Sequence, residues 1–163
     1  MEKNVETNIL IVTSMLLSFL YPFQAKQPVG GIKLLEGYAY EAMPSVDTRV
    51  ATISKKNGLT INIEYGLAGA WAALEDSKDY TWCKEQTING HKVTVALIKP
   101  GLKTVWEPEK PRTKELGNIL LITIPLSKDD PDYAANFKAE IANSEEIADT
   151  LLMVLTFDPA KVN

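Results

Sequence analysis

The residue types that most often perform catalysis are scarce in this chain, which contains one histidine and one cysteine in 163 residues. Cys83 and His91 lie on either side of an expected hairpin, where two paired strands could bring a thiol and an imidazole together. No third side chain is marked by its position to orient the histidine, and no Gly-x-Ser-x-Gly motif is present. We therefore expect Cys83 to be a half-buried strand residue and His91 to flank a turn.

Metal and phosphate sites are not indicated either, because a single cysteine and a single histidine cannot form a zinc ligand set. Asp129, Asp130 and Asp132 cluster in sequence, but they lack the spacing and the central glycine of a calcium loop. Acidic residues at the start of a helix are already explained by the helix dipole. The glycines of residues 65–73 lack the spacing of a phosphate-binding loop. The sequence predicts no metal and no cofactor.

Paired carboxylates are the catalytic arrangement that the composition leaves open, since the chain has 21 acidic residues. Glycoside hydrolysis, for example, needs two carboxyl groups that flank one bond. No pair is singled out by its surroundings. An exported hydrolase that relies on carboxylates, with His91 as an additional base, therefore stays an alternative function.

Aromatic residues are the stronger signal for binding. Tyr38 and Tyr40 are two residues apart, as are Tyr80 and Trp82, so on strands each pair should point to one face of a sheet. Rings that share an open face could bind a sugar, a peptide or another flat ligand; otherwise they fill the core between sheet and helices. With two further tryptophans in or beside loops, the candidate ligand-binding residues are Tyr38, Tyr40, Trp71, Tyr80, Trp82 and Trp106.

Length and charge limit the class of protein. The chain has room for one domain, and its 45% apolar and 23% charged residues are typical of a globular protein. A net charge of −4 and a pI near 5.1 give no reason to approach a phosphate backbone. Nucleic acid is therefore excluded as an expected partner, and a protein or a small molecule is expected instead.

The first 25 residues have the layout of a secretory signal peptide. An uncharged apolar run from Ile9 to Leu20 precedes the small residue Ala25, after which a signal peptidase would cut. The run is short for a membrane anchor, which needs about 20 apolar residues. We predict a removed leader, one domain over residues 26–163, and a periplasmic or extracellular location with membrane contact through the leader alone. An uncleaved anchor, or a core helix over residues 8–21 of a cytoplasmic accessory protein, are the alternatives.

Two hairpins are expected in the first two thirds of the domain. Residues 49–54 and the alternating segment 59–65 flank Asn57-Gly58, a turn dipeptide that tolerates positive φ. Residues 66–79 are rich in alanine and suggest a short helix near 68–75. The second hairpin joins 80–88 to 91–99 through Asn89-Gly90.

The last third of the chain changes character. Residues 118–125 are apolar at almost every position, which predicts a central strand covered on both faces. Ala134, Phe137 and Ile141 then follow a helical spacing, and Asn143 with Glu146 resembles a capping box. These signals favour two C-terminal helices, or one long bent helix. We therefore predict an α+β domain in which a mostly antiparallel sheet built from hairpins packs against C-terminal helices as a layered sandwich.

Four segments carry a resemblance to known proteins: "IKLLEGYAYE", "NGLTINIEYG", "NILLITIP" and the ending "IANSEEIADTLLMVLTFDP". Together they resemble small exported bacterial proteins of unknown function. A late helix that runs into "LTFDP" is also similar to the ending of PsbP/Mog1-like α/β/α sandwich domains. The resemblance implies a fold and a binding or accessory role. It implies no catalytic residues, because that superfamily has no common catalytic set.

The predicted function is therefore a non-catalytic exported domain that binds a protein or small-molecule ligand, and an enzyme is the less favoured interpretation. The exported hydrolase and the cytoplasmic accessory protein remain the two alternatives. The unpaired edges of an antiparallel sheet permit a dimer without requiring one, so the sequence leaves the oligomeric state open.

Overall fold

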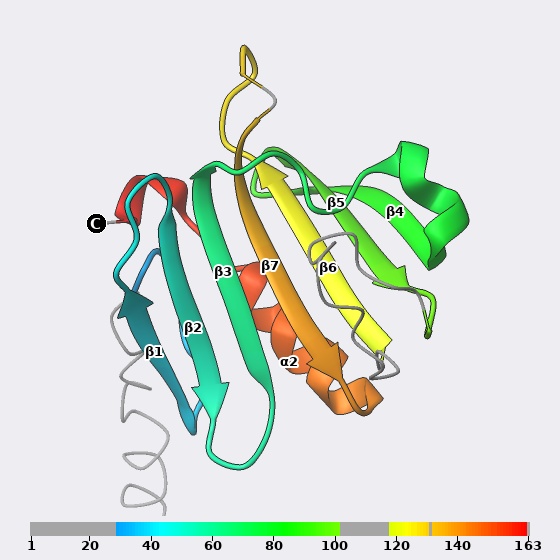
Figure 1. Cartoon of the computed structure of the whole chain (residues 1–163). Coiled ribbons are helices and arrows are strands. Elements are labelled where there is room, and N and C mark those ends of the chain that lie inside the picture. The colour runs from blue at the N-terminus through cyan, green and yellow to red at the C-terminus, as the bar shows by residue number, and fades with distance from the viewer. Residues whose placement is uncertain (1–28, 102–117, 131, 163) are drawn as a thin grey trace, which may run out of the picture.

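The computed structural model describes residues 29–101, 118–130 and 132–162, in which seven strands form one antiparallel sheet (Figure 1). The predicted leader and Trp106 lie outside these residues. The sheet order is β1-β2-β3-β7-β6-β5-β4, so that β7 joins two three-stranded meanders. The strands are β1 (Tyr38–Met43), β2 (Arg49–Lys55), β3 (Thr60–Leu67), β4 (Tyr80–Ile88), β5 (His91–Ile98), β6 (Asn118–Pro125) and β7 (Tyr133–Ile141).

Both predicted hairpins are confirmed, although their turns differ. Asn89 and Gly90 take φ values of 50° and 82°, and the two-residue turn places Ile88 opposite His91. Two consecutive positive φ values define the type I′ turn, whose twist matches that of the paired strands. In the first hairpin only Asn57 takes a positive φ, of 57°, and the connection is longer.

β6 is an interior strand, as its composition predicts. It lies between β5 and β7, and its residues from Ile119 to Ile124 are all buried. The middle position of the sheet belongs to β7 instead.

The predicted helix around Ala134, Phe137 and Ile141 is wrong, because these residues belong to β7. Phe137 and Ile141 face one cluster of buried residues, whereas Ala134 points to the other face of the strand. Both faces are buried at this position, so the apolar residues do not alternate and their spacing resembles that of a helix. Burial on two faces therefore concealed the strand.

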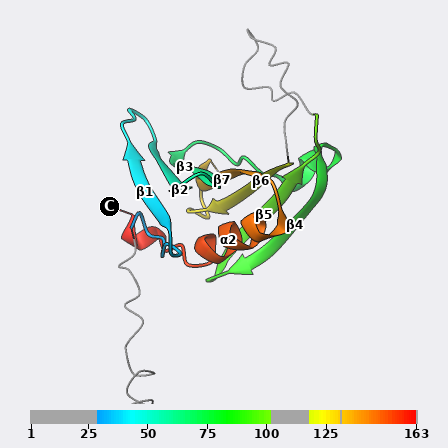
Figure 2. The same cartoon turned by 90° about the horizontal axis from the view of Figure 1, so that it is seen from below.

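One of the two predicted helices exists among the described residues: α2 (Ser144–Val154). Asn143 caps it, since its Oδ1 accepts a hydrogen bond of 3.0 Å from the Glu146 amide. Glu146 accepts a bond from the Ala142 amide at 2.7 Å, one residue earlier than in a standard capping box. The expected cap is confirmed, and the sheet curves around this helix (Figure 2). The fold is thus α+β and mostly sheet.

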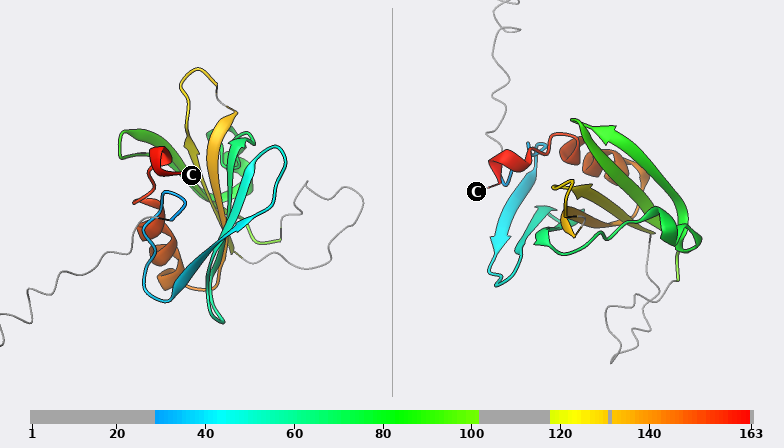
Figure 3. Two further views of the ribbon diagram at one scale, coloured as in Figure 1. Left: turned by 90° about the vertical axis from the view of Figure 1, so that its left-hand side faces the viewer. Right: turned by 90° about the horizontal axis from the view of Figure 1, so that it is seen from above.

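The two faces of the sheet are covered differently. Figure 3 shows α2 and the C-terminal segment on one side, where Phe137, Met153 and Phe157 belong to the main apolar cluster. We call this the helix face. The opposite face carries a smaller cluster around Ala72 and Tyr80, packed under the segment that connects β3 to β4. We call it the crossover face.

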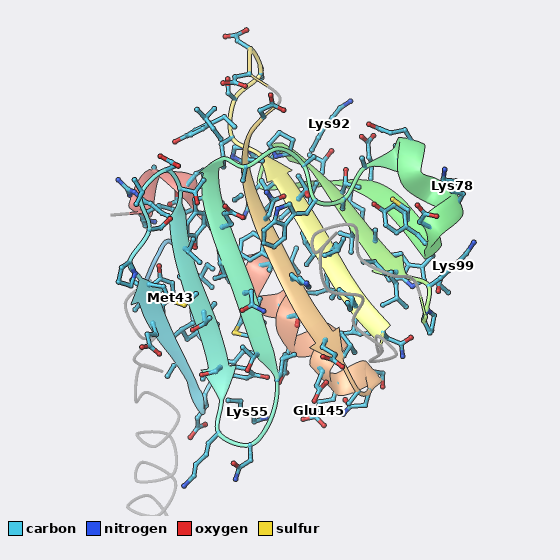
Figure 4. All side chains as sticks on the ribbon, in the orientation of Figure 1. Met43, Lys55, Lys78, Lys92, Lys99 and Glu145 are labelled. Carbon is cyan, nitrogen blue, oxygen red and sulfur yellow. The ribbon has the colours of Figure 1, made fainter. Side chains whose placement is uncertain are left out.

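The segment between β3 and β4 contains a 3₁₀ helix, η1 (Leu74–Asp79), rather than the short α-helix expected near 68–75. Lys99, which directly follows β5, donates a hydrogen bond from its ammonium group to the Lys78 carbonyl, and both residues are labelled at one end of the sheet (Figure 4). A second 3₁₀ helix, η2 (Pro159–Lys161), follows α2 near the C-terminus.

Candidate functional site

The two tyrosines of β1 point to the same face, as predicted, but they serve the packing of the domain. Tyr38 is buried, and its hydroxyl donates a hydrogen bond of 2.7 Å to Asp149 on α2. The Lys55 ammonium lies 5.4 Å from the centre of the Tyr38 ring. Burial, followed by the hydrogen bond to Asp149, raises the pKa of Tyr38. Tyr38 therefore ties an edge strand to the helix.

Tyr40 is half-buried against a backbone turn. Gly30 has a φ of 56°, which favours glycine, and a Cβ atom there would lie 2.5 Å from the Tyr40 ring, which would have to move. The neighbouring Tyr65 hydroxyl donates a hydrogen bond of 3.2 Å to the Gly30 carbonyl, and burial raises the pKa of Tyr65. The ring of Tyr40 has little open surface to offer a flat ligand.

The prediction that Tyr80 and Trp82 share one face is wrong. The pairing of β4 with β5 shifts between these residues, so Tyr80 lies opposite Ile98 and Trp82 opposite Leu97. A β-bulge inserts one residue and thereby reverses the alternation of side chains. Tyr80 packs into the crossover-face cluster together with Trp71, whereas Trp82 packs on the helix face.

The described aromatic residues therefore form no single platform. β1 and β4 lie at opposite edges of the sheet, and the bulge separates the rings of β4 from each other. Trp106 lies outside the described residues.

Cys83 and His91 do not form a pair. Cys83 lies opposite Ala96, whereas His91 lies opposite Ile88 at the turn of the same hairpin. Burial, together with Glu85 and Glu75, raises the pKa of the Cys83 thiol, which lowers the fraction of reactive thiolate. Cys83 is thus a half-buried strand residue, as the sequence predicts.

His91 lines a hollow of about 450 Å³ together with Lys33, Asp158 and Lys161. The Asp158 carboxylate accepts hydrogen bonds from the Ala160 amide at 3.1 Å and from Lys161 at 2.7 Å. The bond from Lys161 lowers the pKa of Asp158, so this group is a carboxylate under ordinary conditions. Asp158 is already used to cap η2, and no hydrogen bond connects it to His91.

A larger cleft, of about 540 Å³, opens at the end of the sheet where β2 begins and β3 ends. Residues 45–48, Arg49 and Tyr133 line it, with Pro159 and Val162 of the C-terminal segment on one side. We call it the Arg49–Tyr133 cleft. Tyr133 keeps 44% of its surface exposed, and Val46 keeps 97%. This combination of rings, apolar side chains and open space is suited to contact with a ligand.

The charged groups of the cleft are only partly engaged. Arg49 donates one hydrogen bond of 3.1 Å from its guanidinium to the Val162 carbonyl. Its remaining N–H groups have no partner among the described residues, and neither has the Asp47 carboxylate at the rim. Thr48 donates to Glu64 at 2.8 Å, which engages that carboxylate within the protein. The cleft can therefore present a cation and an anion to one ligand.

Sequence reasoning missed this cleft because its residues come from five separate stretches of the chain. Aromatic residues attract notice as pairs two positions apart, whereas Tyr133 is isolated and begins a strand whose spacing predicts a helix. The available signal was the loop 44–48, whose proline, serine and aspartate precede an arginine at a strand start.

Metal-binding clusters and membrane-spanning helices are both absent from the described ranges. No group of three or more His, Cys, Asp or Glu side chains is positioned there to hold a metal ion. None of the helices in these ranges has the length and apolar character needed to cross a membrane.

Comparison with protein-family models, with curated proteins and with solved structures found no match to this chain.

Proposed function

We propose that this protein is a non-catalytic exported binding domain and that its ligand occupies the Arg49–Tyr133 cleft. The observation that carries the proposal is the guanidinium of Arg49, whose remaining N–H groups have no partner among the described residues and which lines the same cleft as the exposed ring of Tyr133. Arginine presents its donors in a planar fork that matches a carboxylate. The described lining contains no histidine or cysteine, and its polar groups are an arginine, a carboxylate and hydroxyls, which can recognise a ligand.

The proposed ligand is a small molecule that carries a carboxylate and an apolar or aromatic part. The carboxylate would bind Arg49, and the apolar part would contact Tyr133 and Val46. Asp47 at the rim favours ligands that also carry an ammonium group, such as a free amino acid.

The ligand class can be tested by NMR titration of the purified protein with benzoate, phenylalanine and benzyl alcohol as probes. We expect saturable shifts of the amides of residues 45–49 and 66 with the two carboxylates, and none with the neutral alcohol. Arg49→Gln should weaken carboxylate binding at least about tenfold. Lys56→Gln removes the same charge just beyond the opposite end of β2 and should leave the binding unchanged. Saturable binding that survives Arg49→Gln, or no binding of either carboxylate, contradicts the proposal.

Export is the second part of the proposal, and it is supported by the apolar run before Ala25. The PsbP/Mog1-like resemblance and the layered-sandwich description are proposed with it, since a sheet with α2 on one face is compatible with such a domain. The full-length gene should be expressed in a bacterial host, followed by cell fractionation and intact-mass analysis. A chain that starts near Lys26 outside the cytoplasm is expected. An intact chain in the cytoplasm would instead support the accessory protein with a core helix over residues 8–21.

The carboxylate-dependent hydrolase remains a second candidate because one hollow contains both His91 and Asp158. Hydrolysis there would need Asp158 to leave its bonds to Lys161 and Ala160 and to orient the imidazole. An assay of the purified protein against esters, peptides and glycosides, with His91→Gln as control, separates the candidates. Turnover that His91→Gln abolishes would favour the hydrolase.

A further inference from the structure

The free edge of β4 offers hydrogen-bonding groups for one more strand. β4 spans nine residues and pairs with β5 on one side only, at the end of the sheet (Figure 1). No described residue hydrogen-bonds to the outer side of residues 83–87. A sheet edge of this kind can bind an extended peptide through backbone hydrogen bonds.

The hairpin turn determines which residues of β4 direct their backbone N–H and C=O groups to the free edge. A two-residue turn makes Ile88 and His91 a hydrogen-bonded pair, and the backbone groups of alternate residues then point to β5. Gln86 and Lys84 therefore bond to β5, together with Ile88. The backbone N–H and C=O groups of Cys83, Glu85 and Thr87 point to the free side.

The opposite edge of the sheet, β1, is shorter than β4. The Tyr38 amide of β1 is already bonded to the Leu35 carbonyl at 3.3 Å, and Tyr38 is buried. Pro44 follows the end of β1 and cannot donate a backbone hydrogen bond. β4 is therefore free over a longer stretch than β1.

The charges of β4 oppose pairing with a second copy of this chain. In an antiparallel dimer, residues whose backbone groups point to the free edge must lie opposite residues of the same kind in the second copy. The two-fold axis of such a dimer therefore passes through one residue of β4, which lies opposite its own copy. An axis at Lys84 places this lysine opposite its own copy, and an axis at Glu85 does the same for the glutamate. The first of these registers gives the longest overlap of β4 with its copy and the second is one of the two next longest, and directly opposed like charges are unfavourable. The edge thus favours a different partner.

We propose that the β4 edge binds an extended antiparallel segment of another protein with the order basic, acidic, any residue, apolar. The basic residue would lie opposite Glu85 and the acidic residue opposite Lys84, on the two faces of the added strand. The apolar residue would lie opposite Trp82, which is half-buried on the helix face. This surface is separate from the Arg49–Tyr133 cleft.

The test compares the peptide Val-Thr-Asn-Lys-Glu-Thr-Val-Thr with its charge-swapped form Val-Thr-Asn-Glu-Lys-Thr-Val-Thr. Each peptide carries a fluorescent label, and its affinity for the protein is measured by fluorescence anisotropy. We expect the first peptide to bind about fivefold more tightly. The double variant Lys84→Glu/Glu85→Lys should reverse this preference. Equal affinities, or a preference that the double variant leaves unchanged, would overturn the proposal.

N-methylated peptides test the backbone bonds directly. Methylation of the backbone nitrogen of the peptide's lysine, which would donate to the backbone carbonyl of Glu85, should abolish binding. Methylation of the backbone nitrogen of the adjacent glutamate in the peptide, which would point away from β4, should leave the affinity within about twofold. Arg49→Gln should change neither result, which separates this site from the cleft. A peptide that binds regardless of which nitrogen is methylated contradicts strand addition, as does a stable dimer formed through β4.

Discussion

The two faces of the sheet are held by different kinds of interaction. On the helix face, α2 and the C-terminal segment pack large apolar side chains against the strands, and Phe137 contacts both Tyr65 and Phe157 edge to face. On the crossover face, two buried polar residues hold the connection between β3 and β4. Thr123 and Asn136 accept hydrogen bonds from the backbone amides of Trp71 and Ala72. Apolar packing is spread over many contacts, whereas the crossover depends on a few directional ones.

The largest effect is expected on the helix face, from Phe137→Ala. Phe137 is almost fully buried at the centre of the main cluster, so its truncation removes apolar area and leaves a cavity. Such substitutions typically lower the free energy of unfolding by about 3–5 kcal/mol. Denaturant unfolding followed by circular dichroism measures this loss. Phe137→Leu refills part of the space and should cost less than half as much; equal losses would show that the edge-to-face ring contacts, and not the volume, are decisive.

The crossover face should respond to the loss of one polar side chain. Asn136 is fully buried, and its Nδ2 donates to the Gly69 carbonyl at 2.7 Å. Asn136→Ala leaves the Gly69 carbonyl and the Thr123 hydroxyl without this partner, which should cost about 2–3 kcal/mol. Hydrogen exchange should report the release of residues 69–72 while α2 stays protected.

Asn62→Ala is the matched control, since Asn62 is exposed on the adjacent strand β3. It should change stability by less than about 0.5 kcal/mol. A uniform loss of protection in Asn136→Ala, extending over α2, would show that the two faces unfold as one unit and would remove the distinction between them.

Features that depend on a few neighbouring residues could be predicted from the sequence, whereas features that depend on tertiary contacts could not. Hairpins and caps depend on a few neighbouring residues, so Asn89-Gly90 and Asn143 are recognisable from the sequence alone. β7 is not, because tertiary contacts bury both of its faces and conceal the alternation. The bulge at Tyr80 depends on how β4 pairs with β5, and no residue pattern in β4 marks it. The Arg49–Tyr133 cleft depends on which segments meet in space; the loop 44–48 marks one side of it, but nothing in that loop indicates Tyr133.

Alanine substitutions at two glycines test how tightly the C-terminal segment packs against the residues that precede β1. Gly31 has a φ of 77°, and a Cβ there would lie 2.5 Å from the Asp158 carbonyl oxygen. Gly37 has a φ of 82°, and a Cβ there would have no atom within 4 Å. Gly37→Ala should cost only the backbone strain of about 1 kcal/mol. Gly31→Ala adds a clash with backbone and should cost about 2 kcal/mol in total. Denaturant unfolding of the two variants measures both costs, and equal costs would mean that the C-terminal segment moves freely.

The last effect is an alkaline loss of stability that originates on the helix face, with a magnitude of about 1 kcal/mol for each buried tyrosine. The pKa values of Tyr38 and Tyr65 are raised in the folded protein, chiefly by burial, above the value near 10 of an unfolded tyrosine. Their contribution is therefore complete below pH 10, and it decreases above pH 10, where the unfolded chain releases both protons first. At pH 11 the free energy of unfolding should be lower by about 1 kcal/mol per tyrosine. Denaturant titrations at pH 8 and pH 11 measure this change, and Tyr38→Phe should reduce it by about half. An unchanged pH dependence in Tyr38→Phe would show that the pKa of Tyr38 is not raised in the folded protein.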